Sequence, residues 1–327
     1  MFISIVFHKN SHMPKYAIAL HGGAGTIVRE DMSEELEQAY TRGLEEALDA
    51  GYTILEKGGS AIEAVTKGCM VLEDNILFNA GRGSVFTRSG AHEMDACIMD
   101  GRTLKAGAVT CVHSIKNPIS LAEEVMNHSE HVFLSGEGAV DFAVSRGIRT
   151  EPEDYFYSQF RFDQWKLARD HEETFLDHND QRNEKLIKNK KFGTVGVVAR
   201  DALGNVAAAT STGGMTNKNY NRIGDTPVIG SGNYANNKTC AISCTGHGEI
   251  FLLAVAAYDV SCLMEYRNYS LHQAMDTVVN DKLVNMKGEG GMIGVDSNGN
   301  ISMQFNSLGM YRAARNSEGY KELAIYR

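Results

Sequence analysis

Apolar runs typical of strands alternate with the three- or four-residue spacing of amphipathic helices along most of the chain. Residues 16–20 predict a buried strand that leads into a glycine-rich turn at 21–25. The apolar positions between Leu36 and Ala47 predict one long helix. Further strands are predicted at 93–99, 104–112, 194–200, 206–212, 240–245, 292–296 and 301–305, and further helices begin near 60, 120, 138, 249 and 270. Both halves mix strands and helices without a long repeat, so we expect a mixed α/β sandwich.

One stretch, residues 161–193, interrupts this pattern. It is crowded with charged residues of both signs and contains few apolar ones. A segment of this composition cannot bury enough apolar surface to offset the entropy lost on folding. We therefore expect a mobile linker or a frayed helix over 161–193, followed directly by the strand that begins at Thr194.

Composition excludes several classes of function. The chain has 327 residues, of which 43% are hydrophobic and 22% charged, the profile of a globular protein. A formal net charge of −9 disfavours binding to nucleic acids or anionic membranes. No run approaches about 18 apolar residues, and the apolar start lacks the basic residue and the cleavage site of a signal peptide. We therefore expect a cytoplasmic protein whose six cysteines are reduced thiols.

The junction between the linker and the following strand predicts a processing site. Cleavage of the Gly193–Thr194 bond would give Thr194 a free α-amine beside its own hydroxyl. An α-amine titrates at about pH 7.7–8.0, so it can accept the proton of that hydroxyl near neutral pH. Gly193 suits such a site because it lacks a Cβ and tolerates a strained backbone. The alternative is that this segment is only the start of a strand.

Three later segments suit a substrate with a free amino acid head group. Thr212 ends the strand that pairs with the one after the cleavage site, so it can lie beside the predicted nucleophile. Arg222 can bind an α-carboxylate with two hydrogen bonds, and Asp225 can bind an α-ammonium. The Thr245 hydroxyl and the Gly246 N–H can stabilise an oxyanion. The alternatives are a surface ion pair between Arg222 and Asp225 and a helix cap at Thr245.

These segments belong to an ordered set of motifs that resembles the plant-type asparaginase and isoaspartyl peptidase family of N-terminal nucleophile (Ntn) hydrolases. The motifs are HGGAG at 21–25, FNAGRGS at 78–84, EMDA at 93–96, GTVG at 193–196, STGG at 211–214, RIGD at 222–225, TGHGE at 245–249 and GMYR at 309–312. One of them alone would be weak, whereas the ordered set is highly specific. The family usually has glycine where this chain has Asn221, a change that can alter the local turn without removing Arg222.

The resemblance implies an α+β fold, the four-layer αββα sandwich of the Ntn-hydrolase type, in a single domain of residues 1–327. The precursor is expected to cut itself into an α subunit, residues 1–193, and a β subunit, residues 194–327. The two fragments stay associated and pair into a dimer of heterodimers. No cofactor is expected for catalysis, but a structural sodium ion is.

The resemblance also implies a role for each site residue. Thr194 is the nucleophile, Thr212 hydrogen-bonds and tunes it, and Asn79 is a nearby hydrogen-bonding partner. Thr245 and Gly246 form the oxyanion hole. The substrate-binding residues are Arg222, Ile223, Gly224, Asp225, Thr245, Gly246, His247 and Gly248. The sodium ion is bound by mainly backbone oxygens of Leu72, Glu73, Asn75, Phe78, Ala80 and Arg82.

The expected reaction is hydrolysis of β-aspartyl (isoaspartyl) dipeptides and of L-asparagine, which releases L-aspartate. Three alternatives stay open. Within the same fold, an aspartylglucosaminidase would act on glycosylated asparagine, although the absence of a secretory signal disfavours it. A taspase-like threonine protease would act on folded proteins. From another class, an uncleaved protein could bind small zwitterions without turnover.

Overall fold

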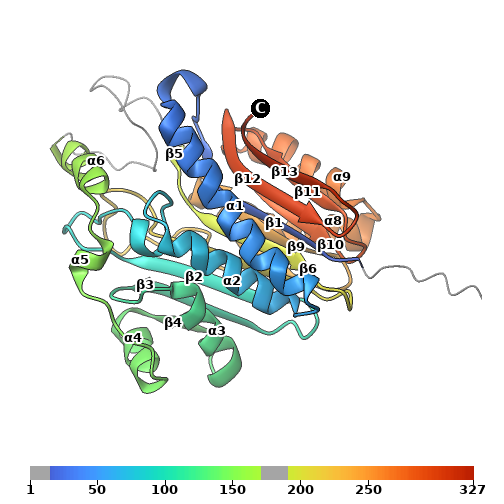
Figure 1. Cartoon of the computed structure of the whole chain (residues 1–327), viewed down its shortest axis with the longest axis horizontal. Coiled ribbons are helices and arrows are strands. Elements are labelled where there is room, and N and C mark those ends of the chain that lie inside the picture. Colours follow the sequence, from blue (N-terminus) through green and yellow to red (C-terminus); the bar gives the residue numbers. More distant parts are fainter. Residues whose placement is uncertain (1–14, 171–190) are drawn as a thin grey trace, which may run out of the picture.

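The computed structural model describes residues 15–170 and 191–327, which fold into a mixed α+β protein, as predicted (Figure 1). The strands are β1 Ala17–Gly25, β2 Met94–Asp100, β3 Ala106–Val112, β4 Phe133–Ser135, β5 Lys191–Phe192, β6 Val195–Arg200, β7 Val206–Thr212, β8 Asn233–Ala235, β9 Cys240–Gly246, β10 Gly290–Asp296, β11 Ile301–Phe305, β12 Gly309–Asn316 and β13 Lys321–Tyr326. The α-helices are α1 Glu34–Glu56, α2 Ala61–Asp74, α3 Pro118–His128, α4 Gly136–Ser145, α5 Glu153–Phe156, α6 Gln159–Asp170, α7 Gly248–Ala254, α8 Ala256–Arg267 and α9 Leu271–Asp276. Short 3₁₀ turns lie at Arg29–Asp31 and Gly81–Gly83, and a π-helical stretch, Thr277–Leu283, continues α9.

The described strands form two sheets that pack against each other. The larger sheet has nine strands in the order β13-β12-β1-β6-β7-β2-β3-β4, with β5 paired to β1. The smaller one has four strands in the order β11-β10-β9-β8. All neighbours are antiparallel except β3 and β4. Strands β1, β6 and β7 contact β9 across the sheet interface, which places the start of β6 against the smaller sheet.

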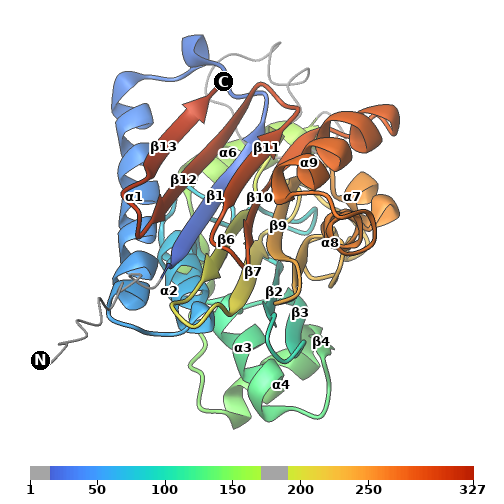
Figure 2. The same ribbon diagram turned by 90° about the vertical axis from the view of Figure 1, so that its right-hand side faces the viewer.

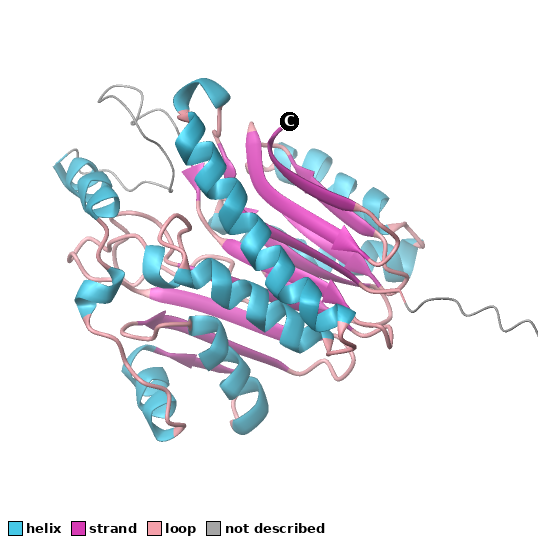
Figure 3. Ribbon diagram, viewed as in Figure 1, coloured by secondary structure: helices cyan, strands magenta, loops and turns pink. Residues whose placement is uncertain are grey.

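Helices cover the outer faces of both sheets. In Figure 2, α1 lies on one side of the strands and α8 and α9 lie on the other. Figure 3 shows the same separation of helices from strands by colour. The apolar stripe of α2 includes the fully buried Val65, Cys69 and Leu72, which pack on the larger sheet. The capping box expected at Ser60 is present, because its side chain and that of Glu63 bind each other's backbone N–H groups.

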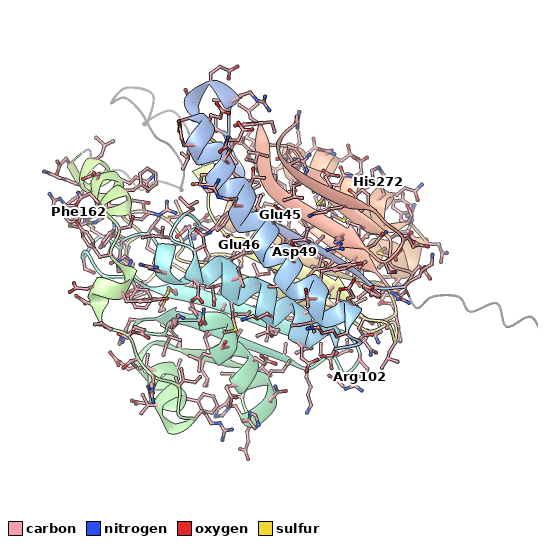
Figure 4. All side chains as sticks on the ribbon, viewed as in Figure 1. Glu45, Glu46, Asp49, Arg102, Phe162 and His272 are labelled. Carbon is pink, nitrogen blue, oxygen red and sulfur yellow. The ribbon has the colours of Figure 1, made fainter. Side chains whose placement is uncertain are left out.

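The polar face of α1 points outward and also ties the helix to the last two strands. Glu45 and Asp49 project from the outer face of α1 (Figure 4). Lys321 of β13 lies 2.7 Å from the Glu45 carboxylate, and Arg315 of β12 lies 3.3 Å from that of Asp49. These half-exposed ion pairs add little stability each, and α1 is held over β12 and β13 mainly by packing. In the described part of the chain, no helix is long and apolar enough to cross a membrane.

The glycine-rich segment at 21–25 is a strand, so the predicted turn is wrong. Strand β1 continues through it to Gly25, with a shift of register between His21 and Ala24. Gly23 adopts a positive φ of 113°, which lets the strand bulge without ending. The aromatic ring of Phe78 fills the space where a Cβ on Gly22 would lie. The glycines therefore permit close packing along a strand rather than a change of direction.

The boundary predicted for the linker also requires correction. Residues 159–170 form helix α6, and Arg161 at its start is fully buried. Its guanidinium donates to the carbonyl oxygens of Gly83 at 2.9 Å and Leu77 at 3.2 Å, while the ring of Trp165 packs against Phe86. Charge counting allowed only a frayed helix here, because it does not register the few side chains that anchor α6. The part of the predicted linker at 171–190 lies outside the described residues.

Candidate active site

Thr194 lies directly before β6, where that strand meets β7. Its side chain is buried, and its Oγ1 donates a hydrogen bond to Oγ1 of Thr212 at 3.2 Å. Strands β6 and β7 are antiparallel neighbours, with Val195 opposite Ser211, and this register brings the two threonines together. The hairpin inferred from the sequence therefore explains the contact without any contribution from more distant elements.

The carbonyl group of Gly193 is held by two hydrogen-bond donors. Asn79 Nδ2 donates to its oxygen at 2.9 Å and Thr212 Oγ1 donates at 2.8 Å. The Asn79 amide is itself fixed, because its Nδ2 also donates to Gly214 O at 2.8 Å and its Oδ1 accepts from Val85 N at 3.0 Å. Donors that are fixed in advance stabilise an oxyanion more than mobile ones. This geometry suits attack on the Gly193 carbonyl carbon.

Arg222 and Asp225 lie beside a small space bordered by Gly224 and Gly248. A Cβ on Gly248 would lie 2.6 Å from Arg222 Nη2 and 3.0 Å from Asp225 Oδ1, and a Cβ on Gly224 would lie 2.8 Å from Arg222 Nη1. Both charged groups therefore reach the same small space, which side chains at 224 and 248 would fill. A zwitterion with a carboxylate and an ammonium on one carbon fits such a space. Ile223, between them in sequence, is 41% exposed at the surface.

The partner of Arg222 is Glu249, which the sequence analysis did not assign. Arg222 donates from Nε and from Nη2 to the two oxygens of the Glu249 carboxylate, both at 2.8 Å. This bidentate pair fixes the guanidinium plane and leaves its Nη1–Nη2 edge toward Gly224 and Gly248. Glu249 lies in the first turn of α7. Among the described residues, Arg222 forms its ion pair with Glu249 and not with Asp225, whose Oδ2 is buried without a hydrogen-bond partner.

Two buried polar atoms at this site have no hydrogen-bond partner among the described residues. They are Oδ2 of Asp225 and Oγ1 of Thr245. Leaving such an atom unsatisfied destabilises a fold by about 1–3 kcal/mol, so it commonly marks the place of a ligand. Burial raises the pKa of Asp225 to about 7, although the nearby Arg222 acts in the opposite direction.

The start of α7 carries the remaining predicted residues. Gly246 has a φ of +156°, and a Cβ there would lie 2.6 Å from both Glu289 O and the ring of Phe251. His247 is the N-cap residue of the helix, and its Nε2 lies 3.7 Å from Glu249 Oε2. Thr245 lies near the end of β9. Its unpartnered hydroxyl is therefore close in sequence to the start of α7, the helix whose Glu249 binds Arg222.

Comparison with known sequences identifies the family of this chain. The family described as asparaginase matches residues 14–325. The chain belongs to the asparaginase family. It is similar to the isoaspartyl peptidase of Salmonella typhimurium, with 50% identity over 96% of this chain and 100% of that protein. The isoaspartyl peptidase of Escherichia coli is 48% identical over 96% of this chain and 97% of its own length. The human isoaspartyl peptidase/L-asparaginase is 38% identical over 91% and 92%.

The loop after α2 is the segment in which the sequence analysis expects a sodium ion. The carbonyl oxygen of Glu73 would lie 2.6 Å from a Cβ on Gly81, and the oxygens of Ile76 and Phe78 crowd the position of a Cβ on Gly83. Backbone oxygens thus lie close to two glycines of this loop, and a hard cation prefers oxygen ligands. The expected set includes two of them, Glu73 and Phe78. Among the described residues, no cluster of three acidic, histidine or cysteine side chains is placed to bind a metal.

Proposed function

We propose that this asparaginase-family chain is an autoprocessed threonine amidohydrolase of β-aspartyl (isoaspartyl) dipeptides and L-asparagine, with L-aspartate as product. The observation that carries the proposal is Thr194, placed after the scissile bond and beside Thr212, together with the head-group space between Arg222 and Asp225. The names of the similar proteins support the substrate class. The packing of two sheets between helices supports the four-layer αββα sandwich of Ntn hydrolases.

The proposed first step is self-cleavage at Gly193–Thr194. Oγ1 of Thr194 attacks the Gly193 carbonyl carbon, and the developing oxyanion accepts hydrogen bonds from Asn79 and Thr212. Collapse of the intermediate breaks the C–N bond, the proton lost from Oγ1 passes to the departing Thr194 nitrogen, and an ester remains between Gly193 and the Thr194 oxygen. Water hydrolyses that ester, which frees the Gly193 carboxylate and gives Thr194 both a hydroxyl and an α-amine.

In the proposed turnover, the substrate's α-carboxylate binds the exposed edge of Arg222 and its α-ammonium binds Oδ2 of Asp225. The α-amine of Thr194 accepts the hydroxyl proton as Oγ1 attacks the side-chain carbonyl. Thr245 Oγ1 and the Gly246 N–H stabilise the oxyanion. Ammonia or an amino acid leaves with the proton, and water then hydrolyses the β-aspartyl ester. Ile223, Gly224, His247 and Gly248 shape the space around the head group.

The arrangement of strands supports lasting association of the two fragments. Strand β1 belongs to the α subunit and pairs on both sides with β-subunit strands, β6 and β12. Strand β2 likewise pairs with β7. Separation of the fragments would break these ladders within one sheet. Exposed apolar side chains on α7 and α8, among them Leu253 and Tyr266, are a candidate contact for pairing into a dimer of heterodimers.

Three parts of the proposal depend on the family resemblance or on the sequence more than on contacts in the structure. The sodium ion would be bound by the backbone oxygens of the loop after α2, where it would stiffen the segment that carries Asn79. Catalysis itself needs no cofactor in this scheme. The cytoplasmic location, and the absence of nucleic-acid and membrane partners, stay predictions from sequence.

The test is to express the full chain and to combine intact mass with sequencing of the smaller fragment from its amino end. We expect fragments 1–193 and 194–327, release of L-aspartate from a β-aspartyl dipeptide and from L-asparagine, and one inactive, uncut chain for Thr194→Ala. Thr239→Ala, a buried threonine remote from the site, should be cut normally. A fully active uncut chain would overturn the proposal. Preference for a glycosylated asparagine or a folded protein would indicate the aspartylglucosaminidase or taspase-like alternative.

A further inference from the structure

A chain of buried polar side chains runs between the two sheets directly behind Thr194. His21 Nδ1 lies 3.1 Å from the Thr194 carbonyl oxygen, and His21 Nε2 lies 2.9 Å from Ser243 Oγ. Ser243 Oγ lies 2.7 Å from Thr210 Oγ1, which accepts a hydrogen bond from Asn233 Nδ2 at 3.0 Å. These four side chains come from β1, β9, β7 and β8, and all are 0% exposed.

Only one arrangement of protons satisfies these contacts. The Thr194 carbonyl can only accept, so His21 Nδ1 must carry its proton. Nε2 of the neutral ring then accepts, so the Ser243 hydroxyl must donate to it. With its own proton used, Ser243 accepts from Thr210, whose hydroxyl lies 2.7 Å from Ser243 Oγ and 3.4 Å from its other acceptor, Gly232 O. Thr210 in turn accepts from the Asn233 amide. The chain therefore has one direction, from Asn233 to the Thr194 carbonyl, and it selects one tautomer of His21.

Two further observations support a tightly packed and neutral His21 ring. A Cβ on Gly196 would lie 2.5 Å from His21 Nε2 and would overlap Ser243 Oγ, so only glycine at 196 permits the hydrogen bond. Burial lowers the pKa of His21 to about 3, so the ring stays neutral at the pH values at which the enzyme would work. A neutral ring that donates from Nδ1 cannot act as a base toward Thr194.

We propose that His21 is a positioning residue that the Ser243–Thr210–Asn233 chain locks as the Nδ1–H tautomer so that it holds the main-chain carbonyl of Thr194. This inference rests on the proposed function of Thr194 as nucleophile. Asn79 and Thr212 hold the carbonyl before Thr194, and His21 holds the one after it. Both peptide groups flanking the nucleophile are thus fixed, and with them the direction of its hydroxyl and its future α-amine.

Two substitutions of His21 test the roles of its two ring nitrogens separately. The amide nitrogen of His21→Asn falls near the place of Nδ1, so it can still donate to the Thr194 carbonyl but cannot reach Ser243. The amide of His21→Gln falls near the place of Nε2, so it can bind Ser243 but leaves the carbonyl without a donor. Misplacing a reacting group by about 1 Å can lower a rate by about a hundredfold. We expect His21→Asn to retain kcat and self-cleavage within about threefold and His21→Gln to lower both by about tenfold or more, with KM unchanged.

The matched pair for the rest of the chain is Ser243→Ala and Ser261→Ala. Ser261 is also a buried serine whose hydroxyl lies 2.7 Å from that of a threonine, Thr239, but this pair has no link to His21. We expect Ser243→Ala to lower kcat and to slow self-cleavage, and Ser261→Ala to change neither. Equal effects of the two serines, or a His21→Gln variant at least as active as His21→Asn, would overturn the inference.

A measurement on the unmodified protein keeps the inference testable if a variant fails to fold. Nitrogen-15 NMR of histidine-labelled protein distinguishes the two neutral tautomers, and the His21 signal is identified by its absence from the spectrum of whichever His21 variant folds. Lack of titration alone does not identify it, because burial also lowers the pKa of His92 to about 4. We expect a protonated Nδ1, and a protonated Nε2 would refute the proposal. The unmodified protein is assayed first. If it is neither cut nor active, the proposed function fails, whereas normal wild-type activity with insensitive variants refutes only the role of His21.

Discussion

Replacement of Asp225 by Asn tests the head-group site through the pH dependence of kcat/KM, which reports groups of the free enzyme. The carboxylate of Asp225 must be ionised to bind the substrate's α-ammonium, and burial raises its pKa to about 7. The α-amine of Thr194 must be neutral to accept a proton, and such an amine titrates at about pH 7.7–8.0. Each group lowers kcat/KM about tenfold for every pH unit below its pKa. The wild-type enzyme should therefore lose about a hundredfold per unit below about pH 7.

Asp225→Asn removes one of the two ionisations. We expect the slope below pH 7 to fall to about tenfold per unit, and kcat/KM at pH 8.5 to fall by about 10- to 150-fold. The 10- to 150-fold fall in kcat/KM corresponds to loss of a hydrogen bond to a charged group, about 1.5–3 kcal/mol. The control is Asp296→Asn, because Asp296 is also a buried aspartate but serves only the turn between β10 and β11. A variant at 225 that keeps the two-proton slope would refute the assignment of Asp225.

The same substitution has a predicted effect on stability with the opposite sign. Because the pKa of Asp225 is raised by folding, the protonated side chain is favoured in the native state, and this contribution is lost as pH rises from about 4 to about 7. Asp225→Asn keeps a neutral side chain throughout. We expect its gain in Tm over the wild type to grow across that pH window and to stay constant above it, in thermal melts followed by circular dichroism. A gain that does not grow with pH would show that burial of the charge is not destabilising.

Three more substitutions test separate parts of the site. Gly248→Ala places a Cβ 2.6 Å from Arg222 Nη2, so we expect KM to rise by about tenfold or more with normal self-cleavage. The control is Gly138→Ala in α4, where nothing lies within 4 Å of the added Cβ and KM should be unchanged. Glu249→Gln weakens the half-exposed pair that orients Arg222, and a rise in KM of about threefold at constant kcat is expected, whereas a loss confined to kcat would contradict a role in binding. Asn79→Ala removes a donor to the Gly193 carbonyl, so a gel time course should show self-cleavage slowed by about a hundredfold, and normal processing would exclude that donor.

Local patterns were sufficient for elements whose signals lie within a few residues. The α1 stripe, the capping box at Ser60 and the β6–β7 hairpin all formed where periodicity and turn residues predict them. Strands β12 and β13 were missed, because β12 pairs with β1 from almost the opposite end of the chain. The single helix predicted to begin near residue 249 is broken at Val255, which has a φ of +50°. No local rule predicts a left-handed valine, since the conformation is disfavoured for a β-branched residue.

Contacts after the break explain why that conformation persists. The N–H groups of Ala257 and Tyr258 donate to the carbonyl oxygens of Ser231 and Gly230, so α8 begins in a direction set by the loop that follows Asp225. A continuous helix would instead direct these two N–H groups to carbonyls of α7. The break therefore results from hydrogen bonds to a distant loop, which the spacing of apolar residues cannot register.

The candidate site shows both what local patterns can predict and where they stop. The contact of Thr194 with Thr212 follows from the β6–β7 hairpin, whereas spacing gave no sign that Glu249 binds Arg222. Asn221 shows how a departure from the family pattern can preserve the site. Its φ is +51°, a conformation that glycine adopts freely and asparagine tolerates better than most residues, and its Nδ2 donates to Glu93 at 3.1 Å. The backbone that presents Arg222 therefore keeps a left-handed turn, and the added side chain anchors it to the residue before β2.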